Sequence, residues 1–216
     1  YDIDHIEFLR GPQGTRFGVG AAPGGVVKVN TRQPGSGWHT AAGFGYAEHD
    51  TQEYRLNTSG PITDQLGLSL SGLYNDREGF ITNLPTGQDI DGRETAAGRL
   101  QFVLTPSEAW TIRLSASAEN HDDGFVPTYN PLTDGGPYRV NRDVPGYVDT
   151  DVSTYGLTAN FSGEHLSFSS VTALRNWEQD LQQDFDFTAI PQPVAEIGFI
   201  PVIGVSQPDV EQLSQE

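Results

Sequence analysis

The 216-residue sequence contains no cysteine and no methionine. The lack of cysteine excludes a disulfide framework, a thiolate metal site and a cysteine nucleophile, and is compatible with both exported and cytosolic proteins. The chain begins at Tyr1 and has no methionine, and its last residues, Glu211 to Glu216, have the pattern of the start of a strand. We therefore expect it to be a piece of a longer protein. Any signal peptide would then lie outside this piece.

Positive charge is scarce. The chain has 12 Lys and Arg against 29 Asp and Glu, so its formal net charge is −17. Such a surface repels phosphate backbones, which excludes a nucleic-acid partner.

Long hydrophobic runs are also missing. Hydrophobic residues make up 36% of the chain, the mean hydropathy is −0.43, and no run is long enough for a membrane-spanning helix. Helix capping signals are absent, whereas 25 Gly and 14 Pro indicate many turns. A soluble protein fits these values, but so does a membrane β-barrel, whose apolar residues occupy only alternate positions.

Catalytic and metal-binding motifs are missing too. There is no G-x-S-x-G and no H-E-x-x-H, and the five His residues are scattered without paired metal-ligand spacing. Gly18–Gly25 lacks the pattern of a phosphate-binding loop, and we interpret His121-Asp122-Asp123 as the start of a solvated acidic loop. We therefore expect no enzyme activity, no catalytic residues, no metal site and no cofactor.

What the sequence does contain is period-two alternation, which begins at Trp38 and predicts strands with one apolar face. In the clearest case Leu66, Leu68 and Leu70 alternate with Gly67, Ser69 and Ser71. The predicted strands are Trp38–Tyr46, Tyr54–Gly60, Leu66–Tyr74, Ala96–Leu104, Trp110–Glu119, Thr154–Phe161 and Leu166–Leu174, with an eighth starting near Val210.

The connections between these strands differ in length in a regular way. After a first short connection, they alternate strictly between short and long. The short ones are His49–Gln52, Pro61–Gln65, Thr105–Ala109 and Gly163–His165, and the long ones are Asp76–Glu94, His121–Asp151 and Glu178–Asp209. In an antiparallel sheet this places every long loop at one end, as in outer-membrane barrels with short periplasmic turns and long external loops. A soluble sandwich has no general reason for that asymmetry.

Aromatic residues cluster at the ends of the predicted strands, on their apolar face. If the strand at Trp38 starts on the periplasmic side, one belt consists of Trp38, Phe102, Trp110 and Phe161, and the outer belt of Tyr46, Tyr54, Tyr74 and Tyr155. Two such belts are typical of the wall of a membrane barrel.

Residues 1–34 differ from the rest of the chain: they are rich in glycine and contain two short β-branched runs, and residues 3–31 carry a recognisable pattern. This stretch resembles the C-terminal part of the plug domain of TonB-dependent receptors, whose pattern is I-E-x-L-R-G-P-x-G-x-x-[YF]-G followed by G-G-V-I-N-I-x-T. The matching positions are Ile6-Glu7, Leu9-Arg10-Gly11-Pro12, Gly14, Phe17-Gly18, Gly24-Gly25-Val26-Val27 and Thr31. The sequence departs from the pattern at Val19–Pro23, which is one residue longer, and at Lys28, where Asn is more common.

The resemblance implies an all-β transmembrane antiparallel barrel, partial here, preceded by the end of an α+β plug. We expect residues 1–35 to belong to the plug and residues 36–216 to the barrel. The plug-docking and structural residues would be Glu7, Arg10, Gly11, Pro12, Gly14, Gly18, Gly24 and Gly25. Glu7 and Arg10 suggest a charge pair within the plug or to the barrel wall, and the glycines permit positive φ and close backbone approach.

By the same resemblance, the protein would import a scarce nutrient, most often a ferric siderophore, across the outer membrane of a Gram-negative bacterium. Its partners would be TonB with its inner-membrane energising complex, reached through a segment upstream of Tyr1, and outer-membrane lipid and lipopolysaccharide. Rings and cations in the long loops could hold an aromatic, anionic metal chelate. The candidate ligand contacts are Tyr129, Tyr138, Arg139, Arg142 and Trp177.

Other functions remain open at this point. Within the family the cargo could be cobalamin, haem or a saccharide. From other classes, a passive porin would have no use for the Gly-rich segment around Arg10-Gly11-Pro12, and a soluble β-sandwich enzyme or binding protein would be found in the aqueous fraction without detergent.

Overall fold

The computed structural model describes residues 3–12, 24–124, 134–183, 189 and 203–215, the last range as backbone only. All regular elements in these ranges are strands, and none of the described residues forms a helix long and apolar enough to cross a membrane. The strands are β1 (Ile3–Arg10), β2 (Gly25–Thr31), β3 (His39–Ala47), β4 (Thr51–Thr63), β5 (Leu66–Arg77), β6 (Thr82–Asn83), β7 (Arg93–Ser107), β8 (Trp110–Gly124), β9 (Arg139–Val140), β10 (Tyr147–Ser162), β11 (Ser167–Gln183) and β12 (Ile203–Gln215).

Eight of these strands form one antiparallel sheet in the order β12-β11-β10-β8-β7-β5-β4-β3. Every predicted strand is present, which confirms the all-β prediction. The strands are longer than their alternation indicated, and β8 continues through His121-Asp122-Asp123, where a loop was expected. That expectation was wrong because backbone pairing with β7 and β10 continues after the apolar alternation has ended.

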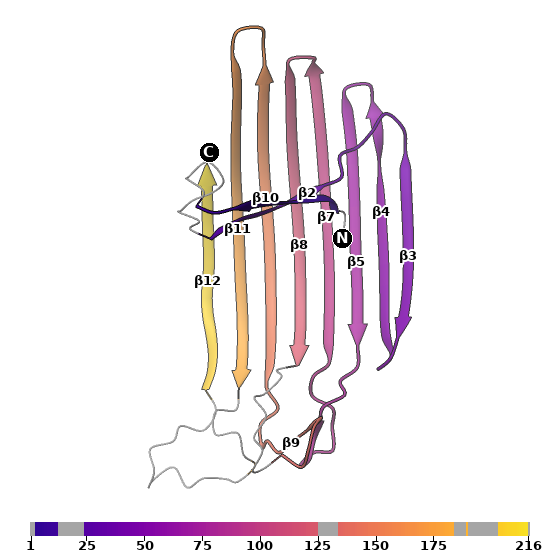
Figure 1. Cartoon of the computed structure of the whole chain (residues 1–216), viewed down its shortest axis with the longest axis vertical. Helices are drawn as coiled ribbons and strands as arrows, with labels where there is room; N and C mark the ends of the chain where they lie inside the picture. Colours follow the sequence, from indigo (N-terminus) through magenta and orange to yellow (C-terminus); the bar gives the residue numbers. More distant parts are fainter. Residues whose placement is uncertain (1–2, 13–23, 125–133, 184–188, 190–202, 216) are drawn as a thin grey trace.

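The predicted difference between the two ends of the sheet is also observed. Residues 64–65, 108–109 and 163–166 connect strands at one end, here called the short-turn end. At the opposite, long-loop end the connections span residues 48–50, 78–92, 125–146 and 184–202. Figure 1 shows the tight turns at the top and the longer connections below.

The two faces of the sheet have opposite polarity because side chains alternate along each strand. On one face Leu70, Leu100, Ala116 and Tyr155 lie in register across four strands. One residue further along, on the other face, the corresponding row is Ser71, Arg99, Ser117 and Thr154. We call these the apolar face and the polar face.

No described residue covers the apolar face. Leu114 is 52% exposed and Tyr155 is 52% exposed, whereas on the polar face Ser71 is 2% exposed and Gln101 is 1% exposed. Among the described residues the buried hydrophobic side chains are Ile90 and Val140, and both lie outside this sheet. A broad, continuous apolar surface with polar groups behind it is the arrangement of a barrel wall that faces lipid.

The aromatic belts show how the strands are inclined. Following the register from Tyr46 on β3 leads to Asp149 on β10, and the belt residue Tyr155 lies six residues further toward the short-turn end. With about 3.4 Å per residue and about 4.8 Å between strands, six residues over five strand steps correspond to a slope of roughly 40°. The other belt slopes the same way: the register from His39, the residue after Trp38, leads to Gly156, so the position level with Trp38 is Leu157, four residues before Phe161.

This slope matches the tilt of about 35–45° that strands need in order to close into a barrel. Neighbouring rings within each belt lie close together: the ring centroids of Tyr54 and Tyr74 are 6.3 Å apart, and those of Trp110 and Phe161 are 5.1 Å apart. We infer that a membrane would lie between the two belts, at an angle of roughly 40° to the register rows.

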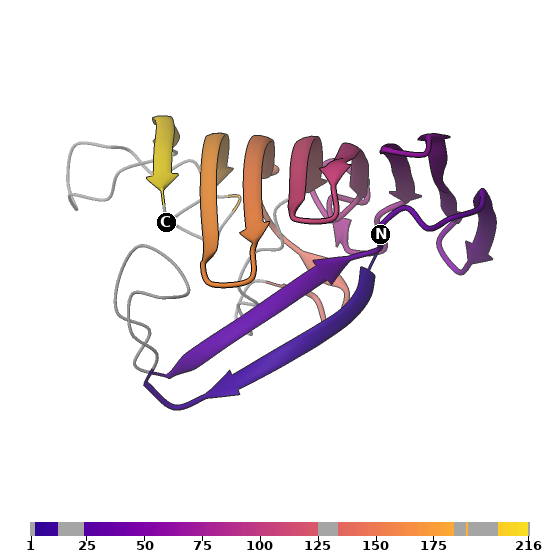
Figure 2. The same cartoon turned by 90° about the horizontal axis from the view of Figure 1, so that it is seen from above.

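The first two strands form a separate antiparallel hairpin, β1–β2. The hairpin runs across the larger strands and lies beside one face of the sheet (Figures 1 and 2). That face is the polar one, because Gln33, directly after the hairpin, bonds to Gln101 and Arg113. The N-terminal segment therefore lies on the side of the wall that a closed barrel would enclose.

Candidate ligand site at the long-loop end

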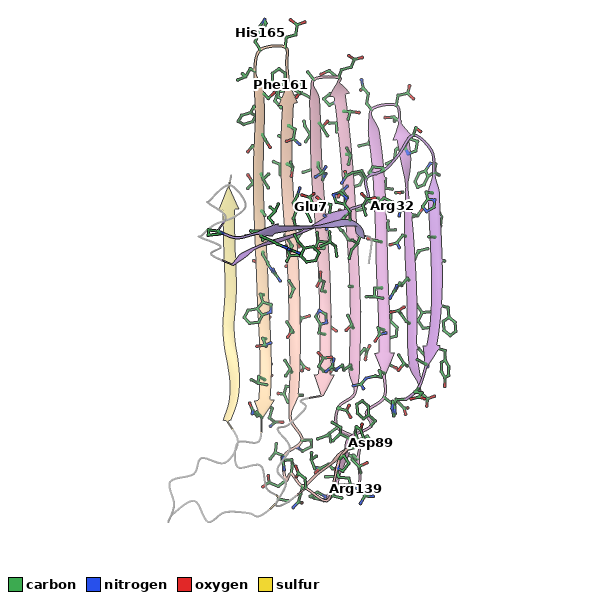
Figure 3. All side chains as sticks on the ribbon, in the orientation of Figure 1. Glu7, Arg32, Asp89, Arg139, Phe161 and His165 are labelled. Atoms are coloured by element: carbon green, nitrogen blue, oxygen red, sulfur yellow. The ribbon has the colours of Figure 1, made fainter. Side chains whose placement is uncertain are left out.

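Two connections at the long-loop end are joined by a short parallel sheet. Thr82 and Asn83 of β6 pair with Arg139 and Val140 of β9. The Leu84 amide donates to the Val140 carbonyl at 2.8 Å, and the Thr82 amide donates to the Tyr138 carbonyl at 3.0 Å. The two loops thus form one folded layer, with Val140 4% exposed (Figure 3).

The interior of this layer is polar. Asn83 is fully buried; its Nδ2 donates to the Arg142 carbonyl at 3.1 Å, and its Oδ1 accepts from the Arg142 amide at 3.0 Å. The Arg142 guanidinium donates to Asp134, with Nη1 2.9 Å from Oδ1 and Nη2 3.3 Å from Oδ2. Arg142, a predicted ligand contact, is 1% exposed, so in this structure its charge braces the loops from within.

A second buried carboxylate organises the start of the β5–β7 connection. Asp91 is 1% exposed, and its Oδ1 accepts from the backbone amides of Phe80 and Ile81, both at 2.6 Å. Its Oδ2 lies 3.2 Å from Arg77 Nη2. Asp91, Asn83 and Asp134 were not predicted from the sequence, because nothing local distinguishes them from the many solvated polar residues of this acidic chain.

The surface of the loop layer carries a small aromatic platform, consisting of His49, Phe80 and Tyr138. The Phe80 ring centroid is 4.8 Å from that of His49 and 5.7 Å from that of Tyr138, which meets it edge-on. Arg77 Cζ lies 4.8 Å from the Phe80 centroid. Tyr138, which was predicted, is 67% exposed. The platform therefore combines three rings with a guanidinium that also pairs with Asp91, and its flat surface suits a ligand with an aromatic ring.

Other predicted residues lie elsewhere. Arg139 is exposed on β9 beside the platform residue Tyr138. Trp177 lies on the polar face of β11, in a row with Val152, Glu119, Ala97 and Leu73. A hollow of about 830 Å³ is lined by this row and the residues beside it. Tyr129 lies outside the described residues.

Those predicted plug residues that the structure describes fall on the hairpin and its ends. Glu7 lies 3.2 Å from Lys28 Nζ, and its Oε1 also accepts from Asn30 at 2.7 Å and contacts His5 at 3.0 Å. The charge pair of Glu7 is therefore formed within the hairpin, with Lys28. Arg10 is directed to the opposite side of β1, since residues three apart on a strand face opposite ways.

The hydrogen bonds among the polar side chains of the hairpin, here called the hairpin network, shift the pKa of two groups, Glu7 and His5. Hydrogen bonds from His5 and Lys28 lower the pKa of the Glu7 carboxyl. The hydrogen bond to Asp4, and after it the one to Glu7, raises the pKa of the His5 imidazole.

The backbone conformation explains why glycine occurs at the end of the hairpin. Gly11 and Gly25 have φ of 82° and 125°, a region that side chains disfavour, and a Cβ on Gly25 would collide with the Leu9 carbonyl oxygen. Pro12 and Gly24 are exposed next to them. Gly14 and Gly18 lie outside the part of the chain that the structure describes. Within that part, no group of three or more His, Asp or Glu side chains could hold a metal ion.

Comparison with known proteins gives three informative similarities, although no family model matches the chain. It is 30% identical over 209 residues to the pesticin receptor of Yersinia enterocolitica, covering 84% of this chain and 30% of that receptor. It is 33% identical over 133 residues to the probable TonB-dependent siderophore receptor PirA of Acinetobacter baumannii, covering 55% of this chain and 18% of that protein.

The third similarity is structural. The crystal structure of the ferric yersiniabactin uptake receptor FyuA from Yersinia pestis matches with a TM-score of 0.73 and 25% sequence identity, over 84% of this chain and 29% of that one. The chain thus spans less than a third of the length of these relatives.

Proposed function

Because this chain belongs to the family of TonB-dependent siderophore receptors, we propose that the full protein imports a ferric siderophore across the outer membrane of a Gram-negative bacterium. TonB, with its inner-membrane energising complex, would supply the force. The outer membrane has no ATP and no sustained ion gradient, so uptake against a gradient needs energy transmitted from the inner membrane.

The observation that carries the proposal is the pairing of an uncovered apolar face with a hairpin on the polar face. Leucine and aromatic side chains are exposed on the apolar face between two sloping aromatic belts, as a wall in lipid requires. A segment that lies on the enclosed side is of no use to an open pore, but it is what a gated importer needs. Residues 1–35 would accordingly act as the end of the plug and residues 36–216 as the start of the barrel.

The loop layer supports a chelate as cargo. The rings of Phe80 and Tyr138 with the nearby Arg77 offer stacking surface and positive charge at the long-loop end. The hollow beside Trp177 lies on the polar face of the sheet, which a closed barrel would enclose. A ligand would be bound first by the loops and then passed to this hollow. Arg139 and Tyr138 would lie on the outer side of the entrance to the hollow.

The test is growth and uptake. A strain lacking the receptor is supplied with iron as ferric yersiniabactin, ferric enterobactin or ferric citrate, and binding of each chelate to the purified full-length receptor is measured. We expect growth and uptake to fail on at least one chelate that the receptor binds. Unchanged growth on every iron source, combined with lost growth on cobalamin, haem or a saccharide, would overturn the siderophore proposal.

A further inference from the structure

The segment that joins the hairpin to the first wall strand, residues 33–38 and here called the tether, is fixed to the wall at several points. The Gln33 side-chain oxygen accepts from Gln101 Nε2 at 3.1 Å and from Arg113 Nε at 3.2 Å. Its amide nitrogen donates to the Thr31 carbonyl at 3.2 Å. Gln33 therefore bridges the last residue of the hairpin and two wall strands, β7 and β8, and its partner Gln101 is 1% exposed.

Two glycines of the wall allow the rest of the tether to approach closely. A Cβ built on Gly67 would lie 2.7 Å from Pro34 Cγ, and one built on Gly60 would lie 2.7 Å from Trp38 Cγ. No side chain larger than hydrogen fits at either position unless the tether moves. The tether thus packs directly against β5 and β4.

The hairpin is less closely packed against the same wall. A hollow of about 170 Å³ separates its base from β3, β4 and β5, and its lining includes Ile3 and Arg32 from the hairpin side and Ala41 and Asn57 from the wall. Figure 3 shows Glu7 on the hairpin as it crosses the wall strands and Arg32 near the start of the tether. The N-terminal segment therefore contacts the wall closely along the tether, and a hollow lies between the base of the hairpin and the wall.

We propose that the tether is the fixed end of the plug. When the hairpin is displaced to open a path for the ligand through the barrel, the displaced segment ends at Gln33, and residues 33–38 stay in contact with the wall. This inference rests on the proposed transport function. Gln33, Gln101 and Arg113 are positioning residues in this scheme, since they hold the segment from which the hairpin moves.

The test uses reducible thiol cross-links in the full-length receptor, formed in outer membranes after assembly. This chain contributes no cysteine of its own. The pair Q33C/Q101C locks the tether, and the pair I3C/A41C locks the base of the hairpin. The matched control S69C/Q101C joins two wall positions that lie in register and loses the same glutamine. Uptake of radiolabelled ferric yersiniabactin, and of any other chelate that the unmodified receptor imports, is measured before and after reduction.

We expect the cross-linked Q33C/Q101C receptor to transport within about twofold of the control, and the I3C/A41C receptor to lose uptake about tenfold or more and regain it on reduction. Loss of uptake in cross-linked Q33C/Q101C, with ligand binding retained, would overturn the proposal, because the tether would then have to move. Full uptake in both locked receptors would overturn it as well. If the unmodified receptor imports no ferric chelate, the proposed function fails instead, which the unmodified protein alone reveals.

Discussion

Arg142 and Asp134 form an ion pair inside the loop layer, with Nη1 2.9 Å from Oδ1 and both side chains at most 1% exposed. They belong to the same β8–β10 connection, and Asn83 couples them to the β5–β7 connection through the two hydrogen bonds to the Arg142 backbone. The shape of the predicted ligand surface therefore depends on polar groups that no ligand touches in this arrangement.

Breaking this ion pair should unfold the loop layer without unfolding the sheet. Asp134→Asn removes the carboxylate charge that pairs with the buried Arg142 guanidinium, and breaking a buried ion pair costs about 3–5 kcal/mol. We expect faster hydrogen exchange at the amides of Leu84 and Arg142, measured on the full-length receptor by mass spectrometry. Arg139→Met, on the exposed side of the same layer, is the control and should leave exchange unchanged. Equal exchange in both variants would show that the pair does not hold the layer.

The side chain of Asn83 should be replaceable by neither alanine nor aspartate. Asn83→Ala removes one donor and one acceptor from a buried site, at a cost of about 1–3 kcal/mol for the groups left unpaired. Asn83→Asp keeps the shape but places an acceptor against the Arg142 carbonyl, so we expect at least as large an effect. Susceptibility of the β5–β7 connection to added protease reports the change. Asp89→Asn, an exposed position in the same connection, should keep the resistance of the unmodified receptor.

Adjacent alanines of β3 test which face meets the lipid. Ala42 lies on the apolar face, in register with Leu56, whereas Ala41 lies on the polar face, in register with Asn57. Lysine at a lipid-facing position near the membrane midplane costs about 2–4 kcal/mol. We expect Ala42→Lys to lower the free energy of unfolding of the full-length receptor in lipid vesicles by this amount, and Ala41→Lys to change it little. If Ala41→Lys lowered the free energy of unfolding more than Ala42→Lys, the polar face and not the apolar face would be the one in contact with lipid.

The close approach of the tether predicts a difference between two glycines of β5. Gly67→Ala places a methyl group against Pro34, and overpacking of this kind costs about 1–3 kcal/mol. Gly72→Ala, on the same strand, has no atom nearer than 3.8 Å to the added carbon and is the control. Urea unfolding of the receptor in vesicles should show the loss for Gly67→Ala. A loss of equal size in both variants would mean that general strand effects, and not the tether, cause it.

The hairpin network predicts how two acids influence His5. The hydrogen bond to Asp4 is the larger cause of the raised His5 pKa and the one to Glu7 the smaller, so Asp4→Asn should lower this pKa more than Glu7→Gln does. Histidine-selective NMR titration of the receptor measures both. Because the pKa is raised in the folded hairpin, the contribution of His5 to stability is complete below its ordinary value of 6.5 and is lost as pH rises through the raised value.

Glu7 titrates with the opposite effect. Its pKa is lowered in the folded hairpin, so its contribution is present above the ordinary value of 4.5 and is lost as pH falls through the lowered one. The two groups together should therefore stabilise the hairpin most at pH values above the titration of Glu7 and below that of His5. A larger effect of Glu7→Gln than of Asp4→Asn on the His5 pKa would reverse the assigned order of causes.

The sequence by itself determined the presence of the eight strands of the large sheet, the asymmetry of the sheet's two ends and its apolar face. These features follow from alternation and from connection length, which are local: Leu66, Leu68 and Leu70 face one way whatever the rest of the chain does. The positive φ of Gly11 and Gly25 was predictable for the same reason, since glycine adopts this conformation without a steric penalty in any context.

Only the tertiary structure decided what happens between segments that are far apart in the chain. The β6–β9 pairing joins residues more than fifty positions apart and buries Arg142, a predicted ligand contact, with its backbone amide bonded to Asn83. The same holds for Gln33, whose partners Gln101 and Arg113 lie 68 and 80 residues away. A polar side chain in a loop or linker has the same local signature whether it is solvated or buried, and only the burial and the partners supplied by the fold distinguish the two.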